Sequence, residues 1–406
     1  MCLACSDYYR AAGICAYRAR SDFYRAAGLC AFAASEAAAA AASEMFYKVF
    51  GVLAPPAGAH GVGEGVFGFL TTRDACALRL VSRMCCADVA AARWLDSETC
   101  IRGSLAAWRA CFPGARAANV KWRRDLTDAD LTHFTGIHTL NISHLTILGS
   151  RSQITNAGLA HLRGIHTLNM RGCNEITDAG LAHLHGIHTL NMSGCNRITD
   201  ACLAHLRGIH TLEMSGCTGI TDAGLTHLRG IHTLGMTYCT GITDAGLAHL
   251  TGIHTLDMRG HTGITDAGLA HLTGIHTLDM RGHTGVTDAG LAHLRGIHTL
   301  TMAFCTGITD AGLAHIRGIH TLDMSGCKKI TASGLEQLRG IRKLSLQGCD
   351  PSIAYAAGSL FRGFAPELAE LTLPSGDRQT AADYRARRTN YPCPCPCPCP
   401  CSPGSW

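Results

Sequence analysis

One internal period dominates this sequence. A block that begins Gly-Ile-His-Thr-Leu, or a close variant of it, returns every 22 residues, with its isoleucine at Ile165, Ile187, Ile209, Ile231, Ile253, Ile275, Ile297, Ile319 and Ile341. Ile137 opens the series one longer step of 28 residues earlier. This period predicts a solenoid, because such a repeat buries its apolar face only by stacking on its neighbours. Solenoids expose long surfaces, so the period favours binding over catalysis.

A single repeat, residues 164–185, predicts its own local structure. Leu168 and Met170 are two residues apart, so their side chains share one face of a short strand. Thr177 is expected to cap a short helix, with Asp178 in its first turn, and Gly186 to end the turn. The apolar positions of the repeat are Ile165, Leu168, Met170, Cys173, Ile176, Leu181 and Leu184.

The spacing of these apolar residues resembles that of the cysteine-containing class of leucine-rich repeats, with a shortened convex part. The resemblance implies an α/β fold: a leucine-rich-repeat solenoid with a curved parallel sheet and short convex helices. Ten repeats of 22 residues are expected over residues 126–350, with a degenerate capping repeat over 351–375.

Composition narrows the functional classes. The net charge is +5 and only 16% of residues are charged, which gives no strong case for nucleic-acid binding. No uninterrupted apolar window of about 20 residues is present, so no membrane span is expected. Arginines interrupt the apolar N-terminal stretches, which argues against a signal peptide. We therefore interpret the 22 cysteines as free thiols in a reducing compartment, the cytoplasm or alternatively the nucleus.

A second motif precedes the repeats. Residues 66–94 read VFGFLTTRDACALRLVSRMCCADVAAARW, with apolar residues at helical spacing on both sides of a turn at Thr71–Asp74. This stretch resembles the F-box, an all-α domain that docks on the adaptor subunit of cullin-based ubiquitin ligases and often precedes leucine-rich repeats. The resemblance implies an F-box-like domain over 45–100 and adaptor contacts from Val66, Phe67, Leu70, Leu78, Leu80 and Val81.

The motif departs from the F-box pattern at two places. The usual Leu-Pro opening is absent, and Met84-Cys85-Cys86 stands where a tryptophan commonly follows Val-Ser-Arg. The match covers about 30 of the 406 residues. The alternative is a helical cap that covers the open edge of the first repeat, which a solenoid needs.

The remaining segments are assigned from composition. Residues 1–44 are a low-complexity helical segment containing a duplication, and residues 376–406 are a disordered tail ending in a Cys-Pro run. Residues 101–125 form a basic linker or N-terminal cap, and we expect Trp108 and Trp122 to pack on the first repeat. A phosphate- or nucleic-acid-binding patch is the alternative for this basic segment.

Eighteen of the 23 histidines fall into two columns of nine. The first column is His138, His166, His188, His210, His232, His254, His276, His298 and His320, and the second is His133, His161, His183, His205, His227, His249, His271, His293 and His315. Stacked repeats place like residues about 5 Å apart. Because protonated imidazoles repel each other, we expect stability to fall as the pH drops through about 6.

Neither a metal site nor a catalytic site is expected. Cys239, His261, His283 and Cys305 are successive members of one column, and four ligands in a straight row cannot surround one ion; a two-ligand His261–His283 site stays as an alternative. No catalytic motif stands out, so we expect a protein without cofactor and without enzymatic activity.

The predicted concave face is the candidate binding surface. Aspartates and arginines alternate at its centre, and two aromatic residues replace the usual glycine just beyond the strand. Exposed aromatic and charged side chains on a rigid face suit protein recognition; the alternative is that the charges only neutralise each other in solvent. The candidate partner-binding residues are Glu213, Tyr238, Asp257, Arg259, Asp279, Arg281, Phe304 and Asp323.

Together these features predict a substrate-recognition subunit of a cullin-type ubiquitin ligase. It would bind the ligase adaptor subunit and a protein substrate, as a monomer within the complex, with no nucleic acid and no membrane. The alternative is a stand-alone repeat scaffold without a ubiquitin role. An adhesion protein outside the cytosol is a third reading, which free thiols oppose.

Overall fold

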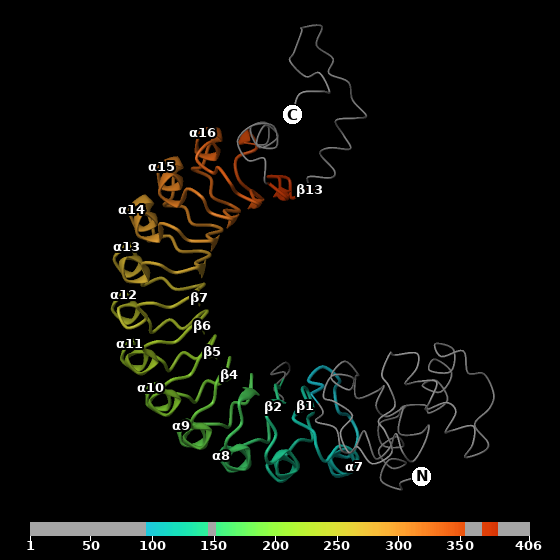
Figure 1. Ribbon diagram of the computed structural model, residues 1–406. Coiled ribbons are helices and arrows are strands. Elements are labelled where there is room, and N and C mark those ends of the chain that lie inside the picture. The colour runs from blue at the N-terminus through green and yellow to red at the C-terminus, as the bar shows by residue number, and fades with distance from the viewer. Residues whose placement is uncertain (1–94, 145–151, 354–367, 381–406) are drawn as a thin grey trace, which may run out of the picture. The chain divides into compact units, whose positions relative to one another are not determined.

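The computed structural model describes residues 95–144, 152–353 and 368–380. They fall into two compact units, one ending at Ile253 and the other beginning at His254. Within each unit, parallel three-residue strands form the sheet and short helices lie on the other side of the repeats (Figure 1). The predicted leucine-rich-repeat architecture, a parallel sheet backed by short helices, is confirmed.

The first unit contains strands β1 to β6. Each pairs in parallel with the next, in the register Thr167↔Thr189 and Leu168↔Leu190 for β3 and β4. Its elements are α7 (Leu105–Cys111), β1 (Ala117–Asn119), η1 (Ala129–Phe134), β2 (Thr139–Asn141), α8 (Asn156–Leu159), η3 (Ala160–Leu162), β3 (Thr167–Asn169), α9 (Asp178–Leu181), η4 (Ala182–Leu184), β4 (Thr189–Asn191), α10 (Asp200–Leu203), η5 (Ala204–Leu206), β5 (Thr211–Glu213), α11 (Asp222–Leu225), η6 (Thr226–Leu228), β6 (Thr233–Gly235) and α12 (Asp244–Leu247).

The second unit contains β7 to β13, of which the last strand runs antiparallel to β12. Residues 378–380 of the expected disordered tail therefore belong to the sheet. Its elements are β7 (Thr255–Asp257), α13 (Asp266–Leu269), η7 (Ala270–Leu272), β8 (Thr277–Asp279), α14 (Asp288–Leu291), η8 (Ala292–Leu294), β9 (Thr299–Thr301), α15 (Asp310–Leu313), η9 (Ala314–Ile316), β10 (Thr321–Asp323), α16 (Ala332–Leu335), β11 (Lys343–Ser345), β12 (Glu370–Thr372) and β13 (Arg378–Thr380).

The core of a repeat is the set of apolar residues expected from its spacing. All seven positions of the repeat 164–185 are buried, from Ile165 to Leu184. The cysteine column adds a polar contact, because the Cys217 thiol donates to the Met192 carbonyl of the preceding repeat at 3.2 Å. Burial raises the pKa of the Cys217 thiol to about 11. All ten cysteines of the described residues are free thiols.

The helices of neighbouring repeats are joined by an aspartate–threonine contact. The carboxylate of Asp178 accepts hydrogen bonds from the backbone N–H (2.8 Å) and the hydroxyl (2.6 Å) of Thr199 in the next repeat. The same contact recurs as Asp128–Thr155, Asp200–Thr221, Asp222–Thr243, Asp266–Thr287, Asp288–Thr309 and Asp310–Thr331. Thr177 lies at the N-cap of α9, as expected, but its side chain makes no capping hydrogen bond there.

The segment expected to be a basic linker or cap begins the sheet. Residues 101–125 contain α7 and β1, and Ala117 pairs with Thr139 of β2. The other edge of β1 is covered, since Ile101 N–H donates to the Asn119 carbonyl at 2.8 Å. Trp108 is buried beside Phe134, with ring centroids 5.8 Å apart, as expected. Trp122 is 53% exposed, so the expectation that it packs on the first repeat is wrong.

Candidate functional site

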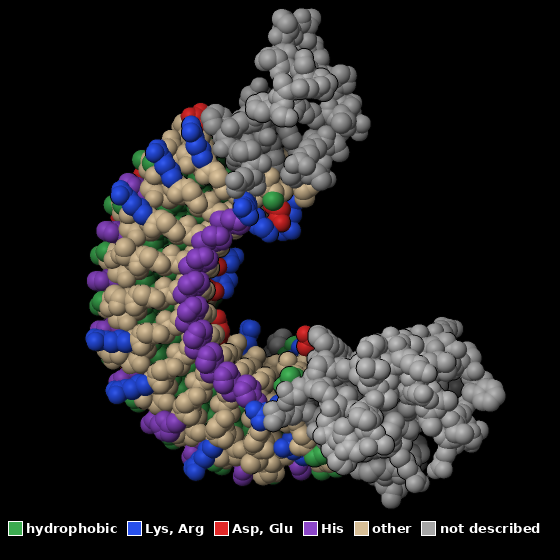
Figure 2. Space-filling model, in the orientation of Figure 1, with side chains coloured by type: hydrophobic (Ala, Val, Ile, Leu, Met, Phe, Trp, Pro, Cys, Tyr) green, Lys and Arg blue, Asp and Glu red, His purple; other side chains and the backbone are tan. Residues whose placement is uncertain are grey.

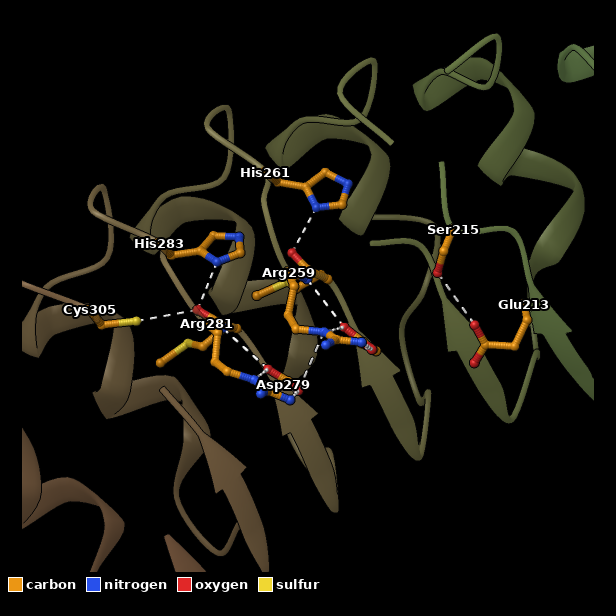
Figure 3. Close-up of polar contacts among 11 residues, drawn as sticks. Glu213, Ser215, Arg259, His261, Asp279, Arg281, His283 and Cys305 are labelled. Atoms are coloured by element: carbon orange, nitrogen blue, oxygen red, sulfur yellow. Dashed lines mark hydrogen bonds and ion pairs between the residues drawn. The ribbon is translucent and has the colours of Figure 1, made fainter. Parts of the chain in front are cut away.

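Two aspartates and two arginines form an ion-pair cluster on β7 and β8 of the second unit (Figure 3). Asp257 and Asp279 are opposite each other in the parallel register. The Arg259 guanidinium contacts the Asp257 carboxylate through Nε (2.8 Å) and Nη2 (2.6 Å), and its Nε is 3.6 Å from Oδ2 of Asp279. Arg281 contacts Asp279 in the same two-pronged way, at 3.0 and 2.6 Å. The cluster thus links neighbouring strands and holds both guanidinium groups in place.

The cluster presents more positive than negative charge to solvent. The side chains of Arg259 and Arg281 are 39% and 43% exposed, whereas those of Asp257 and Asp279 are 26% and 17% exposed. The hydrogen bond with Asp279 raises the pKa of Arg281. An incoming carboxylate or carbonyl oxygen therefore meets guanidinium groups first, with the aspartates beneath them.

Asp323 lies outside this cluster. Its carboxylate accepts a hydrogen bond from Ser325 N–H at 3.0 Å and another from the Ser325 hydroxyl, which is 2.9 Å from the Ser345 hydroxyl. Thr301 occupies the equivalent strand position in the repeat between those of Asp279 and Asp323. The structure therefore brings together four of the predicted charged residues in this unit and leaves Asp323 in a separate serine-lined group.

Phe304 occupies a backbone position that favours glycine. It lies three residues after β9, has φ of 62° and is 64% exposed. Its ring covers the backbone of Gly326 in the next repeat, where an added Cβ would be 2.5 Å from Cδ1 of the ring. Gly172, Gly194, Gly216, Gly260, Gly282, Gly326 and Gly348 fill the same position with positive φ.

Tyr238 and Trp122 occupy the same turn position in the first unit. Tyr238 has φ of 58° and is 65% exposed, and Trp122 has φ of 65° with Lys121 Nζ 4.5 Å from its ring centroid. Among the described residues, these two and Phe304 are the only residues other than glycine with positive φ. Trp122 was not among the predicted site residues. Its signal is its place in the repeat, three residues after a strand, which becomes visible only once β1 is known.

Glu213, the remaining predicted site residue of the first unit, lies on β5. The Ser215 hydroxyl donates to its carboxylate at 3.5 Å (Figure 3). The carboxylate extends over Gly235 of β6, where an added Cβ would be only 2.0 Å from Oε2. The glycine in this strand therefore makes room for the glutamate.

His261 and His283 replace cysteine in the buried column. They are 2% and 1% exposed, and their rings are 6.3 Å apart. Each Nδ1 is within hydrogen-bond distance of the methionine carbonyl three residues earlier, at 2.7 Å and 2.8 Å, so Nε2 points away from it (Figure 3). Burial lowers the pKa of His283. No group of three or more His, Cys, Asp or Glu in the described residues is arranged to hold a metal ion.

The predicted adaptor-binding residues, Val66, Phe67, Leu70, Leu78, Leu80 and Val81, lie outside the described residues. Within the described part of the chain, no helix has the length and apolar character needed to cross a membrane.

A family profile described as Leucine Rich repeat matches residues 161–184. No curated protein sequence matches the chain. Among solved structures, the chain is similar to one in the Rad7–Elc1 complex of yeast, at 14% identity and TM-score 0.47, over 64% of this chain and 76% of that one. It is also similar to internalin C2 of Listeria monocytogenes, at 25% identity and TM-score 0.38, over 49% of this chain and 84% of that one. A chain of the TLR13–ssRNA13 complex is similar at 14% identity and TM-score 0.46, over 70% of this chain and 44% of that one.

Proposed function

We propose that this protein is a non-catalytic receptor that binds a target protein on the strand side of its repeats and brings it to a cullin-type ubiquitin ligase. The observation that carries the binding role is the exposure of Tyr238 and Phe304 at left-handed positions. A non-glycine residue there costs about 1–2 kcal/mol. Mostly exposed rings recover little of this through packing, so their presence supports a role in binding.

The ion-pair cluster adds a polar anchor to this surface in the second unit. Arg259 and Arg281 are each held by a two-pronged contact to an aspartate. Side chains that are already fixed lose little conformational entropy on binding, which favours affinity. Glu213, Tyr238, Asp257, Arg259, Asp279, Arg281, Phe304 and Asp323 are accordingly the proposed contact residues, each considered within its own unit.

The ligase role is supported by the F-box-like sequence at 66–94 and by its position before the repeats. Val66, Phe67, Leu70, Leu78, Leu80 and Val81 are the proposed adaptor contacts. The receptor would act as one copy in the complex, in the cytoplasm or nucleus. The second candidate is a stand-alone scaffold that uses the same repeat surface without an adaptor.

Binding of the full chain to purified ligase adaptor separates these two functions. We expect the wild-type chain to bind and Leu70→Asp and Leu80→Asp each to abolish binding, because a buried aspartate disrupts an apolar interface. Glu336→Gln, an exposed change on the helix side of the second unit, is the control and should bind as wild type. Absence of wild-type binding, with the repeats folded by circular dichroism, would favour the scaffold.

The target-binding surface is tested by comparing proteins cross-linked to three full-length chains. The wild type is compared with Tyr238→Gly/Phe304→Gly and with Arg229→Gln/Arg295→Gln, a pair on the helix side of the repeats. A protein cross-linked by the wild type and the helix-side variant, but lost with the aromatic variant, supports the proposed surface. Equal capture by all three chains would contradict it.

A further inference from the structure

Each unit carries a row of stacked imidazoles beside its strands. The first-column histidines directly precede the strands, and Figure 2 shows histidine side chains in a row along the repeats. Ring centroids of successive members are 4.4, 4.5, 4.6 and 4.5 Å apart from His138 to His232. In the second unit they are 4.5, 4.5 and 4.3 Å apart from His254 to His320. Interplanar angles between 12° and 17° make the rings nearly parallel.

The orientation of each ring is fixed by its own repeat. Nδ1 of His188 is 3.1 Å from the hydroxyl oxygen of Thr189. The same contact, at 3.1 or 3.2 Å, is present for His138, His166, His210, His232, His254, His276, His298 and His320. When Nδ1 carries the proton and donates to the threonine, the lone pair is on Nε2. Every ring of a row then presents Nε2 in the same sense.

The backbone holds this spacing in place. The carbonyl oxygen of His166 accepts hydrogen bonds from the N–H groups of His188 and Thr189 in the next repeat, both at 3.0 Å. The histidines therefore follow the sheet register, and the distance between neighbouring rings is set by the strands. Such a row is a regular series of neighbouring nitrogen ligands rather than a set of independent surface side chains.

We propose that each histidine row binds borderline divalent cations such as Ni²⁺ or Zn²⁺ between the Nε2 atoms of neighbouring imidazoles, with water completing the coordination. Imidazole nitrogen is a preferred ligand of these ions. Metal–nitrogen distances of about 2.0–2.1 Å place two ligating nitrogens roughly 3 Å apart. Tilting two stacked rings toward each other supplies the necessary approach, while the threonine hydroxyl continues to hold Nδ1, as outer-shell acceptors do in metal sites.

The expected ions are exchangeable and few. Only two protein ligands reach each ion, so the sites lack the closed ligand shell of a structural zinc site. Five rings in the first unit form at most two separate pairs, and four rings in the second unit form two more. The periodic spacing suits this arrangement, because neighbouring repeats of a unit offer the same pair of ligands each time.

The second histidine column provides an internal contrast. Its members lie on the short helices, except His249 in the turn after α12, and among the described residues none of its rings stacks face to face on the next. Two of them contact arginines instead, since Nη2 of Arg163 is 3.2 Å from Nδ1 of His183, and Arg207 approaches His227 in the same way. A neighbouring guanidinium repels a metal cation.

Calorimetric titration of the full chain with NiCl₂ at pH 7.5 tests the proposal, after exposed thiols have been alkylated under native conditions. The variant H166N/H210N/H254N/H298N removes alternate members of the row and leaves no neighbouring pair. The control H161N/H205N/H249N/H293N removes the same number of histidines from the second column. We expect the wild type and control to bind Ni²⁺ alike and the row variant to bind at least tenfold more weakly, because chelation by a second ligand is lost.

Retention of wild-type affinity and stoichiometry by the row variant would overturn the proposal, as would a wild type that takes up no Ni²⁺. Histidine modification of the wild type by diethyl pyrocarbonate, read by mass spectrometry, answers the question even if the row variant does not fold. Ni²⁺ should slow the modification of the first-column histidines and leave the second column as reactive as before. Equal reactivity of the first column with and without Ni²⁺ would contradict the proposed site.

Discussion

Asp200 and Thr221, which are 21 residues apart in the sequence, share two hydrogen bonds between neighbouring helices. Oδ1 of Asp200 accepts from the Thr221 N–H at 2.7 Å and Oδ2 accepts from its hydroxyl at 2.6 Å. The N–H and the hydroxyl of Thr221, at the start of α11, thus find their acceptor in the preceding repeat. Stacking is directional for this reason, because the aspartate of one repeat fits only the threonine of the next.

We predict that Asp200→Ala lowers the free energy of unfolding by about 1–2 kcal/mol, since both hydrogen bonds to a charged acceptor are lost. Urea denaturation followed by circular dichroism measures the change. Glu336→Ala, at an exposed site, is the control and should change stability by less than about 0.5 kcal/mol. Equal midpoints for Asp200→Ala and wild type would mean that the contact contributes nothing.

We expect Tyr238→Gly to be more stable than Tyr238→Ala by about 1 kcal/mol, because only glycine adopts positive φ without strain. Both changes remove the exposed ring, so their difference isolates the backbone cost. Thermal unfolding of the two variants gives this difference. If alanine were as stable as glycine, the argument that the aromatic residue is kept at a cost in stability would fail.

Acidification should destabilise the fold through His283. Burial holds the pKa of His283 below its ordinary value of 6.5 in the folded state. The unfolded chain therefore binds the proton first, so stability is greatest above pH 6.5 and declines as the pH falls through and below that value. Desolvation and charge repulsion by the neighbouring histidines lower the pKa of His188 and His276 as well.

The measurement is the urea midpoint at pH 7.5 and pH 5.5, for the wild type and for His283→Cys. One proton contributes at most about 1.4 kcal/mol per pH unit. Cysteine is the residue that other repeats place in this column, so the variant should fold and should lose less stability between the two pH values. A wild-type midpoint that does not move between these pH values would refute the prediction.

The cysteine column should resist alkylation in the folded protein. Burial raises the pKa of Cys173 to about 11 and of Cys239 and Cys327 to about 12, which removes the reactive thiolate at pH 8. Among the described cysteines, the partly exposed Cys100 should react with iodoacetamide first. Mass spectrometry of peptides with and without denaturant checks the order. Rapid native labelling of Cys239 would show that its repeat opens.

The sequence was sufficient to predict the repeat itself. Spacing alone identified the buried residues from Ile165 to Leu184 and the left-handed glycine after each turn, because both follow from local geometry. It also located Phe304 and Tyr238 at the glycine position beyond the strand. These predictions succeeded because the same local backbone geometry recurs in every repeat and requires the same kinds of residue at the same positions.

Contacts between repeats were harder to predict from the sequence. Asp178 was interpreted as a charge favourable to its own helix, whereas it pairs with Thr199 of the next repeat. The glycine two residues after the helix start has a similar role between repeats, since an added Cβ at Gly224 would be 2.4 Å from the Asp200 carboxylate. The β1 strand was missed because residues 117–119, Ala-Ala-Asn, lack the sequence of the later strands. A periodic sequence pattern predicts the structure of the repeats that share it, but not that of a repeat whose sequence has diverged.

The Asp200–Thr221 contact also bears on how such a chain changes over generations. The aspartate of each repeat accepts from the next repeat, and its threonine donates to the preceding one. Any complete copy therefore fits between any two others within a unit. Duplication or deletion of 22 residues by unequal recombination then regenerates the interfaces on both sides of the junction. The number of repeats becomes a trait that can vary freely, and a longer repeat keeps the contact too, since Asp128 and Thr155 form it although they are 27 residues apart in the sequence instead of 21.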